Sequence, residues 1–249
     1  MRCLLLACVL LCNVTSADEI LIVGNNYSIP KIYAEEDEPQ GMLVDILRYV
    51  DAAMPEHQLN LHLYPWARAY KVAESGQAGI IGLSWTTERQ EIFDYSEALF
   101  YDEVVIVVRH DDNLNFNRIE DLKGRRIGLG AGGSFGDEFD QARRQGVFQV
   151  DEDNGPVSRL KKLLAHRIDV ALINPGTAGL SRAIALDPEL SRRAAEFQVL
   201  AQPLKRDANY LGFHKSLQMS GFLTEFNQHI RRGYANGDIQ RLLARYQLP

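Results

Sequence analysis

Two segments far apart in the chain follow one pattern, and this repeat constrains the fold more than any other feature of the sequence. Residues 77–84 and 167–174 each begin with a polar residue, continue into an apolar run and end on a small polar side chain, Ser84 and Asn174. Such a run, preceded by a helical pattern, is typical of a strand that is buried on both faces of a parallel sheet. The repeat therefore predicts two similar α/β units in one chain.

The same alternation of strands and helices extends over the rest of the chain. We expect strands at residues 19–24, 62–64, 78–84, 103–109, 126–129, 168–173 and 209–213. Helical patterns cover residues 42–54, 68–74, 119–122, 135–145, 158–166 and 222–247, the last interrupted near Gly237. A polar loop is expected from the end of the first strand to Gly41. No low-complexity linker separates the two units, which indicates that strands connect them.

The first 17 residues have the pattern of a secretory signal peptide. Arg2 is the only charged residue before Asp18, residues 3–12 are apolar, and Thr15 and Ala17 are the small residues that a signal peptidase requires. A buried helix or a membrane anchor is the alternative, but this apolar stretch is too short to span about 30 Å of hydrocarbon. We therefore expect cleavage after Ala17 and export from the cytoplasm.

Composition and cysteine positions exclude several classes of function. A net charge of −6 gives no basic footprint for nucleic acid, and 46% hydrophobic with 24% charged residues is typical of a globular protein. All three cysteines, Cys3, Cys8 and Cys12, lie in the predicted signal, so no disulfide or thiolate site is expected after cleavage. The six histidines lack the paired spacing of zinc enzymes. We expect a monomer without metal or cofactor.

Several motifs, in this order, resemble those of the bacterial extracellular solute-binding proteins of family 3, which serve polar amino-acid uptake through ABC transporters. They are Gly82-Leu-Ser-Trp-Thr-Thr-Glu-Arg89, Phe93-Asp-Tyr-Ser96, Leu122-Lys-Gly-Arg-Arg-Ile-Gly128, Gly132-Gly-Ser134, Arg167-Ile-Asp-Val-Ala171 and Asn236-Gly-Asp-Ile239. The resemblance implies a type II periplasmic-binding-protein fold, in which two α/β lobes are joined by two hinge strands and close on a ligand. Lobe 1 would comprise residues 18–103 and 206–249, and lobe 2 residues 104–205.

Arg89 resembles the arginine with which this family holds its ligand. A guanidinium offers two parallel donors that match a carboxylate in geometry and charge. Arg89 follows a predicted strand, and open α/β sheets bind ligands just beyond the carboxyl ends of their strands. Ser84 and Gly82 lie at the same strand end, where a hydroxyl and backbone groups would complete the contacts to an anion. A surface arginine beside two turn residues is the alternative.

Ser134 and Asn174 are the candidates from the second unit. Ser134 precedes a predicted helix, where its hydroxyl would either bind an anion or cap the helix. Asn174 stands where the resemblance would place an acid that pairs with the ligand's ammonium group, and asparagine supplies no charge. A zwitterionic ligand would then need another acid, for which Asp102 and Asp137 are candidates.

Aromatic side chains supply the remaining candidates for the walls of the site. Trp66 lies in Pro65-Trp-Ala-Arg-Ala69, and Tyr27 follows the first strand. Their faces provide apolar area and attract cations, although either ring would serve equally in a core. Arg68 is a second candidate for an anion contact or a surface residue at a helix start.

Two motifs favour other functions. Gly128, Gly130 and Gly133 have the spacing of a dinucleotide fingerprint, which is weak evidence alone. Residues 132–136 match the nucleophile elbow of a serine hydrolase, with Ser134 as nucleophile and Asp169 and His214 in the chain order of a triad. A secreted hydrolase, or another enzyme on a similar scaffold, is therefore the alternative to a binding protein.

The favoured interpretation is a periplasmic solute-binding protein with no catalytic residues. It would capture a small carboxylate-bearing molecule, with an amino acid or an analogue as the expected ligand. An ABC permease or a membrane receptor would be its partner, so a role in sensing is an alternative to transport.

Overall fold

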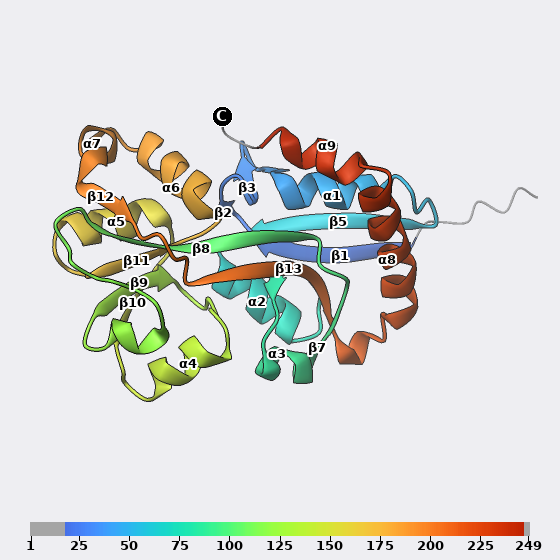
Figure 1. The fold of residues 1–249 in the computed structure, drawn as a ribbon. Helices are drawn as coiled ribbons and strands as arrows, with labels where there is room; N and C mark the ends of the chain where they lie inside the picture. The colour runs from blue at the N-terminus through green and yellow to red at the C-terminus, as the bar shows by residue number, and fades with distance from the viewer. Residues whose placement is uncertain (1–17, 247–249) are drawn as a thin grey trace, which may run out of the picture.

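The computed structural model describes residues 18–246, and the predicted signal peptide, residues 1–17, lies outside them. Figure 1 shows two α/β lobes side by side, joined by two long strands, β8 (Phe100–Arg109) and β13 (Lys205–His214). The main sheet has the strand order β10-β9-β11-β8-β13-β6-β1-β5 and therefore runs through both lobes. The predicted α/β class with two connecting strands is confirmed.

The first lobe forms around parallel strands. β1 (Asp18–Asn25) lies between β5 (His57–Tyr64) and β6 (Gly79–Ser84) and is parallel to both. The short β7 (Phe93–Tyr95) pairs with β13. Helices cover the sheet: α1 (Met42–Asp51), α2 (Trp66–Glu74), α3 (Thr87–Ile92), α8 (Ser220–Ala235) and α9 (Asp238–Ala244).

The second lobe repeats this arrangement, as the sequence pattern predicts. β9 (Arg126–Gly130) is parallel to both β10 (Gln149–Asp153) and β11 (Val170–Ile173). β12 (Phe197–Val199) pairs with β8. The helices of this lobe are α4 (Asp137–Arg144), α5 (Pro156–Leu164), α6 (Gly176–Ala185) and α7 (Pro188–Arg192), with a 3-10 helix at Ile119–Leu122.

The prediction of a polar loop before Gly41 is wrong. This segment forms a second, three-stranded antiparallel sheet of β2 (Tyr27–Ser28), β3 (Ile32–Glu35) and β4 (Glu38–Gln40). Its strands are too short to show an alternating pattern, and the buried Ile32 side chain packs the small sheet onto the core of the first lobe. The segment between β2 and β3 holds Lys31 beside the connecting strands.

The connecting strands pair directly with each other over Lys205–Asn209 and Phe100–Val104. Asp102 and Asp207 are directly opposite in this antiparallel ladder, an arrangement that costs energy for two like charges unless each has a partner. Lys31 Nζ lies 2.7 Å from Asp102 Oδ2, and Lys205 Nζ lies 2.7 Å from Asp207 Oδ1. The two ion pairs therefore stabilise the joint between the lobes.

Each lobe has its own hydrophobic core. Ile22, Leu43 and Phe226 are fully buried in the first lobe, and Ile127 and Leu172 in the second. No helix within residues 18–246 is both long and apolar enough to cross a membrane.

Gly128 lies where α5 packs closely on β9. A Cβ atom there would be 2.9 Å from Arg159 Cγ and closer still to Ile168 Cδ1, so we expect Gly128→Ala to destabilise the protein by about 1–3 kcal/mol. The matched control is Gly221→Ala, because a Cβ atom at this helical position meets nothing within 4 Å. It should leave stability unchanged or raise it by up to about 1 kcal/mol. Urea denaturation of both variants tests this, and equal midpoints would contradict the packing role of Gly128.

Candidate functional site

A cavity of about 140 Å³ lies between the lobes. Its walls contain residues at or just beyond the carboxyl ends of the parallel strands in both lobes: Asn25, Pro65, Ser84, Gly130, Asp153 and Asn174, for β1, β5, β6, β9, β10 and β11 respectively. Open α/β sheets place ligands at this edge because loops and exposed backbone groups converge there. The topology thus brings both lobes to one site.

All of the side chains and backbone positions predicted from the sequence line this cavity: Tyr27, Trp66, Gly82, Ser84, Arg89, Ser134 and Asn174. Residues from the beginning, middle and later parts of the chain therefore meet in one place. Their role in binding a ligand stays a prediction.

Arg89 is held firmly at the cavity wall. The helix α3 begins after Thr86, whose Oγ1 accepts a hydrogen bond from the Arg89 backbone N–H at 3.1 Å. The guanidinium donates from Nη1 to the Ser84 carbonyl oxygen at 3.2 Å, and its Cζ lies 4.9 Å from the centre of the Tyr70 ring. The residue is 5% exposed, yet it forms no ion pair with any carboxylate in residues 18–246.

Arg89 also affects the tyrosine beside it. Burial raises the pKa of the Tyr70 hydroxyl, and the nearby guanidinium opposes part of this rise. The Trp66 ring centre lies 5.9 Å from Arg89 Cζ, so two aromatic faces support the same cation. This packing fixes the guanidinium before any ligand arrives.

The two serines are oriented differently from the expectation. Ser84 Oγ donates to Asp207 Oδ2 at 2.5 Å, and Ser134 Oγ donates to Asp140. Each hydroxyl hydrogen is thereby directed at a carboxylate rather than at an anion in the cavity. A ligand carboxylate would therefore depend on Arg89 and on backbone N–H groups of this wall.

The other predicted residues contribute shape and neutral polarity. Gly82, near the carboxyl end of β6, has a φ of +82°, a conformation that residues with a side chain rarely adopt. Asn174 follows β11, and its side-chain amide has no hydrogen-bond partner within the described part of the chain. Tyr27 and Trp66 are wall residues, and Tyr27 is 39% exposed.

The sequence did not identify four charged residues of the wall: Lys31, Asp153, Arg159 and Asp207. Arg159 Nη2 lies 2.8 Å from Asp153 Oδ1, and Arg159 Nε donates to Asp153 Oδ2 at 3.0 Å. Both side chains are buried, so this ion pair is a fixed part of the second lobe. Arg159 lies on the buried face of α5, whose other buried residues are leucines. The sequence alone does not show that this arginine is buried, so it gave no signal of a role.

The two acids suggested as partners for an ammonium group have other partners. Asp102 pairs with Lys31, and burial raises the pKa of the Asp102 carboxyl while the Lys31 ammonium opposes the rise. Asp137 Oδ2 accepts a hydrogen bond from Thr87 Oγ1 at 2.6 Å, and Asp137 Oδ1 accepts one from the Thr87 backbone N–H at 3.2 Å.

Contacts across the cavity show that the lobes are closed on each other. Thr87 belongs to the first lobe and Asp137 to the second, so their hydrogen bonds bridge the opening. Trp66 Nε1 also donates to the Gly132 carbonyl oxygen, at 3.1 Å. The Tyr27 ring packs against Gly155, where an added Cβ atom would be 2.8 Å from Tyr27 Cε1.

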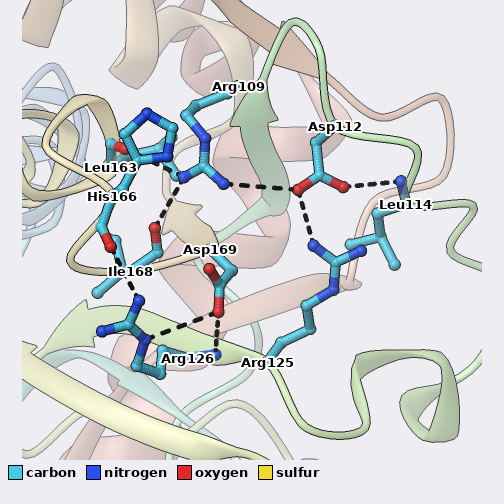
Figure 2. Close-up of polar contacts among 9 residues, drawn as sticks. All are labelled: Arg109, Asp112, Leu114, Arg125, Arg126, Leu163, His166, Ile168 and Asp169. Carbon is cyan, nitrogen blue, oxygen red and sulfur yellow. Dashed lines mark hydrogen bonds and ion pairs between the residues drawn. The ribbon is translucent and has the colours of Figure 1, made fainter.

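The residues of the hydrolase alternative do not meet. Asp169 lies before β11, at the end of the lobe opposite the cavity, and accepts a hydrogen bond from the Arg126 backbone N–H at 2.8 Å. Figure 2 shows it in a polar cluster with Arg126, next to a second group in which Asp112 contacts Arg109 and Arg125.

His214 lies in the first lobe, where its Nδ1 is 2.7 Å from Ser216 Oγ. Since Ser134 donates to Asp140, no hydrogen-bonded Ser134-His214-Asp169 triad exists within residues 18–246. The same described residues contain no group of three His, Cys, Asp or Glu side chains arranged to hold a metal ion.

Comparison with known proteins identifies the family. The sequence profile of the bacterial extracellular solute-binding proteins, family 3, matches residues 20–249. The chain belongs to this family. The resemblance seen in the sequence motifs is confirmed, and so is the type II periplasmic-binding-protein fold. No curated protein sequence matches the chain.

Solved structures with the same fold include proteins of different roles. The substrate-binding protein of an amino acid ABC transporter is 16% identical with a TM-score of 0.72, covering 92% of this chain and 98% of that one. A histidine kinase sensor domain similar to periplasmic binding proteins is 19% identical with a TM-score of 0.77, covering 92% and 96%. An arginine transport system periplasmic binding protein from Legionella pneumophila is 14% identical with a TM-score of 0.73, covering 93% and 100%.

The Thr87–Asp137 contact should stabilise closure. Asp137→Ala removes the exposed hydrogen bonds that the Thr87 backbone N–H and hydroxyl donate to Asp137. If the closed form loses about 1 kcal/mol of stability, the ratio of open to closed molecules rises about fivefold. Small-angle X-ray scattering of the ligand-free protein measures this as a larger radius of gyration.

The matched control is Glu138→Ala, which removes the neighbouring exposed acid from the same first turn of α4 without removing a contact across the cavity. The control should scatter as wild type does. An Asp137→Ala profile identical to wild type would show that the contact does not stabilise the closed form.

Proposed function

We propose that this family member is a periplasmic protein that captures a small carboxylate-bearing solute by closing its two lobes around it. The solute would be delivered to an ABC permease, and the protein would act as a monomer and make or break no bond. Residues 1–17 would be a signal peptide cleaved after Ala17, in agreement with the extracellular location of the family. The lobes would comprise residues 18–103 with 206–249, and 104–205.

One observation carries the proposal: a buried arginine without an acidic partner faces a cavity between two lobes. Burying a charge costs several kcal/mol unless it is paired or hydrogen-bonded. Among the described residues, the Arg89 charge is stabilised by the Ser84 carbonyl and by the Tyr70 and Trp66 rings rather than by a carboxylate. A ligand carboxylate would complete the pairing and gain a bidentate, charge-assisted contact.

Closure would follow from the same contact. Arg89 lies in the first lobe, whereas Ser134, Arg159 and Asn174 lie in the second, so a ligand that touches both sides binds the closed form more tightly than the open form. The connecting strands β8 and β13 would carry the hinge motion. The closed surface would be the signal that a membrane partner recognises.

A sensor role is the second candidate, and the histidine kinase sensor domain with the same fold supports it. The two roles differ in their consequence for the cell. Deletion of the gene should abolish uptake of the labelled solute if the protein serves transport, and should leave uptake intact while removing a response to the solute if it serves sensing.

Arg89→Ala should lose binding. Removal of a buried bidentate contact costs on the order of 2–5 kcal/mol, which is roughly thirtyfold or more in affinity. Protein freed of copurified ligand by unfolding and refolding should show a thermal shift with one class of carboxylate, and the shift should vanish in the variant.

The matched control is Arg68→Ala, because Arg68 is exposed outside the cavity and packs on the Tyr64 ring at 4.2 Å. Arg89→Lys separates charge from geometry, since lysine keeps the charge and loses the planar fork. It should bind more weakly than wild type while melting close to it in the absence of ligand. Undiminished binding by Arg89→Ala would contradict the proposed site.

A further inference from the structure

We infer that the cavity takes a carboxylate whose remaining groups are uncharged, so that a 2-hydroxy acid or a similar oxygen-bearing acid fits and the corresponding α-amino acid does not. This inference rests on the proposed function, because it concerns the ligand of the same site.

The charges of the wall are paired, with one exception. Lys31 pairs with Asp102, Arg159 with Asp153, and Asp207 with Lys205, at distances of 2.7 to 2.8 Å. Only Arg89, among the described charged residues that line the cavity, lacks an ion-pair partner. The wall therefore has one uncompensated positive charge, which a single carboxylate neutralises.

The acids of the wall already have cationic partners. Asp153 Oδ1 accepts hydrogen bonds from Arg159 Nη2 and from the Gly155 backbone N–H at 3.0 Å, and its Oδ2 accepts one from Arg159 Nε. Asp207 Oδ2 accepts from Ser84 Oγ, while its Oδ1 pairs with Lys205. An ammonium group would have to share one of these acids with the cation that already pairs with it, and the two like charges would repel each other.

Asp102 Oδ1 is the remaining acid oxygen, since it is buried and without a hydrogen-bond partner. Asp102 does not itself line the cavity in the described structure, whereas its partner Lys31 does. An ammonium group approaching Asp102 from the cavity would therefore meet the Lys31 charge first. Repulsion between like charges makes this acid unavailable to a cationic group.

The aromatic faces are also occupied. The Arg89 guanidinium lies against the rings of Tyr70 and Trp66, and the Tyr27 ring packs on Gly155. A second cation on the Tyr70 or Trp66 ring would lie beside Arg89 and be repelled by it. The Tyr70 and Trp66 rings thus support the arginine and provide no separate site for an ammonium group.

Asn174 is an uncharged polar residue of the wall, as are Asn25, Ser28 and Asn154. It lies at the end of β11 in the second lobe, and its amide both donates and accepts hydrogen bonds. A hydroxyl or keto oxygen satisfies this amide without a countercharge. An ammonium group would gain one hydrogen bond there and no ionic compensation for its lost hydration.

The test uses matched pairs that differ only at the 2-position. The probe pairs have uncharged side chains: L-alanine and L-lactate, L-leucine and L-2-hydroxyisocaproate, and L-phenylalanine and L-phenyllactate. L-malate, L-2-hydroxyglutarate and argininic acid, each of which carries a second charge, are the controls that should bind more weakly, and tighter binding by one of them would overturn the inference. Refolded wild-type protein is screened by thermal shift, and dissociation constants are measured by calorimetry for each pair with a hit. For the skeleton that binds, we expect the hydroxy acid to bind about tenfold or more tightly than the amino acid.

Asn174→Asp places a negative charge in the cavity wall, where it can pair with an ammonium group. The ratio of the affinities for the amino acid and its hydroxy acid should shift about tenfold or more toward the amino acid. The charge-matched control is Asn113→Asp, an exposed position outside the cavity, which should keep the wild-type ratio. An unchanged ratio in Asn174→Asp would overturn the assignment of Asn174 as the residue that contacts the group at the 2-position of the ligand.

The outcomes separate the inference from the proposed function. An amino acid that binds wild type as tightly as its hydroxy acid, with binding lost in Arg89→Ala, overturns the inference and leaves the proposed function intact. Binding that persists in Arg89→Ala, or no binding by either member of any pair, contradicts the proposed function and the inference with it.

Discussion

The antiparallel pairing of β8 with β13 is the interaction on which the rest of the structure depends. In the main sheet of the described chain, this ladder joins the strands of the second lobe (β10, β9, β11 and β8) to those of the first lobe (β13, β6, β1 and β5). It therefore fixes how the two lobes face each other. The ladder places Asp102 and Asp207 opposite each other, and Lys31 and Lys205 compensate them. Lys31 also donates to Asn209 at 3.1 Å, so the small sheet of the first lobe braces both connecting strands.

The electrostatics of the cavity follow from this architecture. Both lobes direct the carboxyl ends of their parallel strands at one opening, which gathers charged residues from distant parts of the chain. In a partly buried site such charges are stable only when they are paired. The structure pairs every lining charge of the described residues except Arg89. In the function that we propose, a contact between that arginine and a ligand carboxylate would drive binding and closure.

The sequence predicts the fold and much of the cavity wall because those features have local signals. Arg89, Ser84 and Asn174 follow buried strands, and strand ends in an α/β fold meet at one edge. Lys31 could not be identified in this way, because its partner Asp102 is 71 residues away and its own segment has no periodic pattern. The direction of the Ser84 hydroxyl likewise depends on Asp207, 123 residues away. Pairing between distant residues is a property of packing, and a single sequence does not display it.

The most direct test of the central claim is a crystal structure of the protein with the carboxylate that stabilises it. The account predicts that the ligand carboxylate lies in the cavity between the lobes, with both oxygens within hydrogen-bond distance of the Arg89 guanidinium and with the Arg159–Asp153 and Lys31–Asp102 pairs intact. A ligand carboxylate bound to Arg159 or Lys31 in place of their acids, or bound outside the cavity, would contradict it.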